Sequence, residues 1–172
     1  MRAFVAIEPD EDACDALEAV QTGLPSARRT PRDNLHLTLL FLGDQPQHAL
    51  SALDDELAAI RLPPFTIVLQ GLGVIGDHGL HAEAVLSPQL EALHTAVARA
   101  ARAAGIVPER RRFRPHVTLA RLRDPGDPRL APWLTRQAGF AARMQVTGFS
   151  LFRSDLRPDG ARHTELAHYP LG

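Results

Sequence analysis

The stretch N-L-H-L-T-L at residues 34–39 returns in altered form as R-P-H-V-T-L at residues 114–119. Both copies place a histidine, a threonine and a leucine at the same spacing, and the two histidines lie 80 residues apart. The segments around them also recur in one order: helix, His-x-Thr strand, helix, hairpin. A pattern that recurs at a fixed offset indicates a duplicated structural unit.

The expected elements define the two repeat units as about 9–86 and 88–168. Strands are expected at 2–8, 34–42, 65–75, 79–86, 113–121, 144–153 and 161–168, and helices at 9–23, between Pro46 and Pro63, from Pro88 to Ala104, and at 129–137. A chain of 172 residues is long enough for one well-packed core and short for two. The sequence therefore predicts a single domain, residues 1–172, of two interleaved lobes.

Composition excludes several kinds of chemistry. The chain has no lysine, so all 19 basic residues are arginine. Lysyl-nucleotide ligation, a pyridoxal Schiff base and a P-loop are therefore excluded. A net charge of −1 and the absence of a long apolar stretch predict a cytoplasmic protein that does not use a membrane and contacts nucleic acid only locally.

Strand geometry predicts that the histidine and the threonine of each motif lie on the same face of their strand. Because side chains alternate along a strand, His36 and Thr38 point to one face and the neighbouring leucines to the other. In the second copy His116 and Thr118 share a face with Arg114. If the two copies pack about a pseudo-two-fold axis, two imidazoles and two hydroxyls can meet across one groove.

Such a groove suits displacement at phosphorus. With an unperturbed pKa near 6.5, one histidine can be neutral and accept a proton while another is protonated and donates one. Threonine hydroxyls and an arginine can bind the phosphoryl oxygens. The residues around the motifs include no H-x-x-x-H pattern or acidic partner for a zinc site, so we expect neither a metal nor another cofactor.

Four segments of the chain resemble the two-histidine (2H) phosphoesterase superfamily, and within it the RNA 2',3'-cyclic phosphodiesterases formerly called 2'-5' RNA ligases. These are R-A-F-V-A-I-E at 2–8, N-L-H-L-T-L-L-F-L-G at 34–43, F-R-P-H-V-T-L-A-R at 113–121, and the terminal segments F-S-L-F-R-S-D-L and G-A-R-H-T within 149–164. The resemblance implies an α+β fold whose two antiparallel sheets face each other across a central cleft, with the helices outside.

The same resemblance implies an activity and roles for the motif residues. The activity is hydrolysis of a terminal 2',3'-cyclic phosphate to a 2'-phosphomonoester without a metal or cofactor. His36 would donate a proton to the leaving 3' oxygen, His116 would activate water, and Thr38 and Thr118 would hold the phosphate. Relatives often have tyrosine where this chain has His163, which we expect at the surface or at the edge of the groove.

Substrate-binding candidates come from the arginines and aromatics near the motifs. In a regular strand Arg112 and Arg114 share the face of His116, whereas Arg121, which matches an arginine of the family, falls on the opposite face unless the strand bulges. Phe41 and Phe152 could stack on a base, although strand aromatics more often belong to the core. The remaining histidines, at 48, 78, 81, 94 and 168, are interpreted as solvated or structural.

Several functions stay open at this point. The leading hypothesis is a monomeric enzyme that acts on RNA ends or small cyclic nucleotides. The alternatives are 2'-5' joining of RNA by the reverse reaction, a binding module without turnover, and a cyclic phosphodiesterase for a non-RNA nucleotide.

Overall fold

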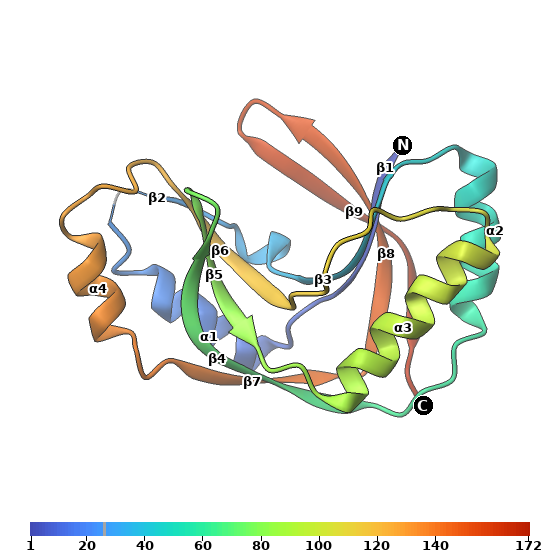
Figure 1. Cartoon of the computed structure of the whole chain (residues 1–172), viewed down its shortest axis with the longest axis horizontal. Helices are drawn as coiled ribbons and strands as arrows, with labels where there is room; N and C mark the ends of the chain where they lie inside the picture. The colour runs from blue at the N-terminus through green and yellow to red at the C-terminus, as the bar shows by residue number, and fades with distance from the viewer. Residues whose placement is uncertain (26) are drawn as a thin grey trace.

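A computed structural model, which describes residues 1–25 and 27–172, has one antiparallel sheet with helices against its outer surface (Figure 1). The strands are β1 (Arg2–Ile7), β2 (Ala27–Arg29), β3 (Leu37–Asp44), β4 (Phe65–Ile75), β5 (Gly79–Ala84), β6 (His116–Leu122), β7 (Ala141–Val146), β8 (Gly148–Arg157) and β9 (Gly160–Pro170). The helices are α1 (Glu11–Gln21), α2 (Gln47–Ala58), α3 (Pro88–Ala103) and α4 (Leu130–Arg136), with a short 3₁₀ turn η1 at Arg32–Asn34. This confirms the predicted α+β class.

The sheet consists of two halves that meet at the motif strands. The strand order is β7-β4-β5-β6-β3-β1-β8-β9, with β2 added beside β6. Two separate sheets were expected; instead the halves are joined where Leu37 of β3 pairs with Val117 of β6. It is the one register pair between β3 and β6 among the described residues.

Each motif strand is covered by the helix that precedes the other motif strand in the sequence. The helix α1, which precedes β3 in the chain, packs against β6 and β7, and α3, which precedes β6, packs against β3. Figure 1 shows α1 and α4 on one half and α2 and α3 on the other. The origin of this arrangement in a duplication of units 9–86 and 88–168 stays a prediction.

The alternating pattern places the leucines as expected. Leu35, Leu37 and Leu39 are at most 2% exposed, as are Val117 and Leu119, and all belong to one continuous core. Burial of these aliphatic side chains stabilises the pair of central strands and holds the polar residues between them on the open side.

Three predicted strands had wrong boundaries, and the first of them, expected at 34–42, begins only at Leu37 and ends at Asp44. The strand expected at 113–121 begins only at His116, because Pro115 has no N–H to donate to a ladder. The strand expected at 144–153 is divided between two strands: residues 144–146 are the end of β7, which pairs with β4, and β8 begins at Gly148. The last hairpin is β8–β9, and its turn is at the predicted R-P-D-G. β2 was not predicted. Within the described residues no helix has both the length and the apolar character needed to span a bilayer.

Candidate active site

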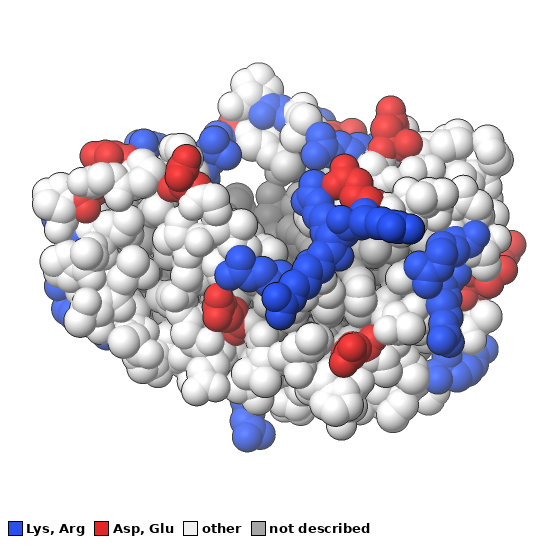
Figure 2. Space-filling model, viewed as in Figure 1, with Lys and Arg blue, Asp and Glu red and all other residues white. Residues whose placement is uncertain are grey.

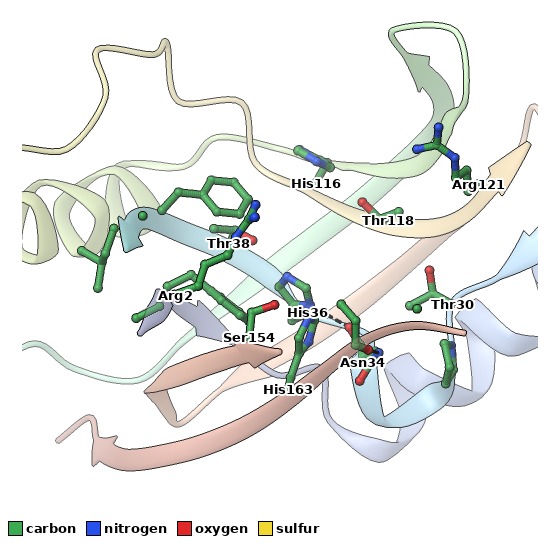
Figure 3. Close-up of a pocket in the computed structure, with 18 of the residues that line it drawn as sticks. Arg2, Thr30, Asn34, His36, Thr38, His116, Thr118, Arg121, Ser154 and His163 are labelled. Atoms are coloured by element: carbon green, nitrogen blue, oxygen red, sulfur yellow. Dashed lines mark hydrogen bonds between the residues drawn. The ribbon is translucent and has the colours of Figure 1, made fainter. Parts of the chain in front are cut away.

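A cleft of about 960 Å³ opens between the two halves of the sheet, and both His-x-Thr motifs line it. His36, Thr38, His116 and Thr118 all belong to its wall, so residues 80 positions apart share one cavity. Figure 2 shows a hollow near the middle of this face with arginine side chains on its border. Figure 3 shows His36 and Thr38 of the first motif and His116 and Thr118 of the second around one pocket, on the neighbouring segments that contain β3 and β6.

Both histidines are held by the same local hydrogen bond. Nδ1 of His36 lies 2.6 Å from the carbonyl oxygen of Asn34, and Nδ1 of His116 lies 2.6 Å from that of Arg114. A carbonyl only accepts, so Nδ1 carries the hydrogen in each ring. Nε2 is therefore the nitrogen of each ring that can exchange a proton with a substrate.

The surroundings disfavour the charged form of each histidine. The pKa of His36 is lowered to about 4, mainly by burial and to a smaller extent by His163 and His116, against the opposing effect of the Asn34 carbonyl. The pKa of His116 is also lowered, first by burial and then by His81 and Arg114, against the opposing effects of the Arg114 carbonyl and Glu83. Burial therefore favours the neutral form of both rings near pH 7, and a bound anion would favour their protonation.

Matching β-bulges follow the two motifs. Beside β1, Ala6 pairs with Thr38 and Val5 with Leu40, so Leu39 has no partner of its own. Beside β5, the same irregularity skips Leu119, between Thr118 and Ala120. The extra residue reverses the alternation, and the side chain five positions after each histidine returns to the cleft.

The bulges explain the positions of two predicted residues. Phe41 and Arg121, the fifth residues after His36 and His116, both line the cleft. Regular alternation would have directed Arg121 to the other face. Phe41 is 53% exposed, so its ring is an accessible apolar part of the wall.

The other predicted binding residues lie elsewhere. Phe152 is 7% exposed and stacks on Phe4 at 5.3 Å between ring centroids, so it is a core residue and cannot receive a base. Arg114 lies outside the wall of the cleft, 3.6 Å from Glu83, and Arg112 is exposed and also outside it. Strand alternation does not apply to either arginine, because residues 107–115 are not a strand; substrate binding by Arg112 and Arg114 stays a prediction.

Four arginines of the cleft were not predicted. They are Arg2, Arg28, Arg29 and Arg111. Arg28 and Arg29 belong to β2, a strand of three residues whose sequence has no apolar alternation. The loop before β6 contributes Arg111, which pairs with Glu109 at 2.6 Å.

His163 has a more central position than expected. It lines the cleft, half-buried, and its ring meets that of His36 edge-on at 5.0 Å between centroids. Burial lowers its pKa. On the other side His81, which is 2% exposed, meets His116 in a similar way at 5.1 Å. Each motif histidine therefore has a second imidazole beside it, which no sequence pattern indicated.

Comparison with known proteins agrees with this architecture. Residues 9–158 match the family described as the 2'-5' RNA ligase superfamily. The RNA 2',3'-cyclic phosphodiesterase of Thermus thermophilus is 36% identical, over 99% of this chain and 90% of that protein. The chain therefore belongs to the 2'-5' RNA ligase superfamily.

Solved structures show the same relationship. The chain is similar to E. coli LigT in its apo form, with a TM-score of 0.79, 27% identity, and coverage of 99% of this chain and 96% of that one. It is also similar to E. coli LigT complexed with 3'-AMP, with a TM-score of 0.76, 27% identity and the same coverage.

Proposed function

We propose that this protein hydrolyses the 2',3'-cyclic phosphate at the 3' end of RNA and leaves a 2'-phosphomonoester. The observation that supports this most is the pair of imidazoles on one cleft, each with Nδ1 bonded to a carbonyl, close enough for His116 to lower the pKa of His36. Several relatives are named RNA 2',3'-cyclic phosphodiesterase, among them those of Thermus thermophilus and E. coli. A cleft bordered by arginines suits an anionic RNA end or a small cyclic nucleotide.

The proposed reaction is an in-line displacement at phosphorus. Nε2 of His116 takes a proton from water as the water oxygen bonds to phosphorus, and the bond from phosphorus to the 3' oxygen breaks. Nε2 of His36 gives its proton to that oxygen, so each ring ends in the protonation state in which the other began. The direction follows the family resemblance, since the two rings have matching hydrogen bonds.

Threonine and arginine side chains would stabilise the phosphoryl oxygens as charge shifts. Thr38 and Thr118 face the cleft from the two motif strands, and Arg121 lies beside Thr118 (Figure 3). Hydroxyl donors on both sides and a guanidinium on one can bind the non-bridging oxygens. We propose that no metal takes part, because these groups supply the acid, the base and the charge stabilisation. Among the described residues no three metal-ligating side chains gather.

The test uses an RNA oligonucleotide that ends in a 2',3'-cyclic phosphate, incubated with the protein in EDTA. The expected product gains one water and carries its phosphate on the 2' oxygen, which mass spectrometry and ³¹P NMR identify. A joined product would favour 2'-5' ligation, and unchanged substrate retained by the protein would favour a binding module. A strict requirement for a divalent ion would contradict the metal-free mechanism.

Substitution of the histidines tests their roles. His36→Ala and His116→Ala should each lower kcat by about 10² to 10⁴ with the fold intact, the usual contribution of one acid or base. The matched control is His48→Ala, since His48 is an exposed residue of α2 outside the cleft. Near-normal turnover in either motif variant would remove that residue from the mechanism.

A further inference from the structure

We propose that Gln21 and His94 are positioning residues, each of which fixes one of the two β-bulges and so places Arg121 or Phe41 in the cleft. This inference rests on the proposed function for its assay, but the contacts behind it do not. Both residues lie on helices, and neither is part of the wall of the cleft.

The bulge of the second motif strand is held by Gln21. Nε2 of Gln21 donates to the carbonyl oxygen of Leu119, the extra residue of the bulge, at 2.7 Å, and also to that of Thr30 at 3.0 Å. The backbone N–H of Thr30 donates to the same Leu119 oxygen at 2.8 Å. Gln21 is only 5% exposed, so water does not readily replace its amide. Two residues after Leu119 comes Arg121.

The bulge of the first motif strand is held by His94 in the equivalent way. Nδ1 of His94 donates to the carbonyl oxygen of Leu39, again the extra residue of the bulge, at 2.9 Å. The ring of His94 also stacks flat on Phe113, with centroids 3.9 Å apart. Phe113 lies three residues before His116, so His94 connects the first bulge with the segment that leads into the second motif.

The two contacts share one design although they use different side chains. In each copy a helix that packs on the sheet donates one side-chain N–H to the carbonyl of the residue that the bulge leaves without a partner on β1 or β5. The donors are exchanged between copies: α1, which precedes the first motif, holds the second bulge, and α3 holds the first. A buried carbonyl that loses its donor costs about 1–3 kcal/mol. Loss of Gln21 removes one of the two donors to the Leu119 carbonyl and leaves the N–H of Thr30, whereas loss of His94 removes the side-chain donor to Leu39.

Loss of either donor should therefore move only the residue that follows its own bulge, which is Arg121 for Gln21 and Phe41 for His94. Relaxation of the Leu119 bulge would move Arg121, and relaxation of the Leu39 bulge would move Phe41. Displacement of a catalytic-site group by about 1 Å can cost up to about 10² in rate. A residue with a merely structural role would lower stability without this selectivity.

The experiment is a set of double-mutant cycles on kcat/KM for the cyclic-phosphate oligonucleotide. Gln21→Met removes the amide and keeps the length of the side chain, and His94→Phe removes the donor and keeps the stacked ring. Gln21→Met should lower kcat/KM about tenfold in the wild-type background but less than about twofold in Arg121→Ala, and its effect should be undiminished in Phe41→Ala. His94→Phe should show the opposite selectivity.

A conservative variant completes the design. His94→Asn presents an amide N–H near the place of Nδ1 and should restore most of the activity lost in His94→Phe. If Gln21→Met does not fold, as judged by circular dichroism, Gln21→Asn, which shortens the reach of the amide, takes its place in the cycles.

The outcomes separate this inference from the proposed function. Effects of the same size in all backgrounds, with wild-type protein active, would overturn the positioning roles and leave the function standing. An inactive wild-type protein would overturn the function; the cycles would then use Kd for sulfate, and additive effects on Kd would overturn the positioning roles.

Discussion

The lowered pKa of His36 predicts a strong coupling between protonation and anion binding. Burial holds this pKa at about 4 in the empty cleft, so at about pH 7 only about one ring in 10³ is protonated. A single negative charge about 4 Å from the ring would favour the protonated form by about 4 kcal/mol at an effective dielectric constant of about 20, and sulfate, with two negative charges, should supply at least this much. That corresponds to a rise of about three pH units, which brings the pKa of His36 in the complex to about 7.

Thermodynamic linkage converts this difference into an affinity. Between the free and bound pKa values each sulfate ion is bound together with one proton, so its affinity should rise about tenfold for each unit by which the pH is lowered from about 7 to about 5. His116, whose pKa is also lowered, can add to the slope. Sulfate is the suitable probe because its own charge stays constant over this range.

Isothermal titration calorimetry at several pH values measures this slope, and NMR titration of the His36 ring measures the two pKa values. The control is His36→Gln, which keeps a polar side chain without the titration and should lower the slope by one proton. A free His36 pKa near 6.5, or the same slope in the variant, would refute the reasoning.

Three further predictions concern binding and stability. Arg121→Ala should lower kcat/KM by about 10² or more, because a guanidinium at the phosphate is lost. Arg112→Ala, outside the cleft, should change kcat/KM less than about threefold. Steady-state kinetics compares the two variants, and equal effects would contradict the assignment of Arg121. Phe152→Ala should lower the free energy of unfolding by about 3 kcal/mol in urea denaturation, while exposed Phe41→Ala should cost less than about 1 kcal/mol and instead raise KM for oligonucleotides. Because the pKa of His36 is lower in the folded state, the unfolded state binds more protons below about pH 6.5; the free energy of unfolding should fall by about 1–2 kcal/mol from about pH 7 to about pH 5, and less in His36→Gln.

The fold class and the core of the motif strands could be predicted because they depend on local patterns. Alternation of leucines with polar residues determines which face of β3 and β6 is buried, and the prediction for Leu37 and Leu119 was confirmed. The joining of both halves into one sheet could not be predicted, since it depends on one pair, Leu37 with Val117, across distant segments. β2 escaped detection because Ala27–Arg29 is short and mostly exposed.

The candidate site was predicted where the motif itself supplies the residues and missed where tertiary structure supplies them. The motif residues of both strands line the cleft as expected. Arg112 and Arg114 were assigned by extending strand alternation backwards through Pro115, where the strand does not exist. His163 comes from β9, remote in sequence from both motifs, so no spacing rule could bring it beside His36.

The bulges show why matching strands can serve an asymmetric reaction. The backbone after each histidine is shaped alike, yet the fifth position presents an aromatic ring in one copy, Phe41, and a guanidinium in the other, Arg121. Displacement at phosphorus needs different groups on its two sides, because one oxygen arrives as another leaves. A positive charge on one side would draw the phosphoryl oxygens toward Arg121 and leave the ring of Phe41 for the attached nucleoside. These two side chains would then determine the orientation in which the substrate binds in the cleft. Exchange of the two side chains should impair binding more than either alanine substitution alone.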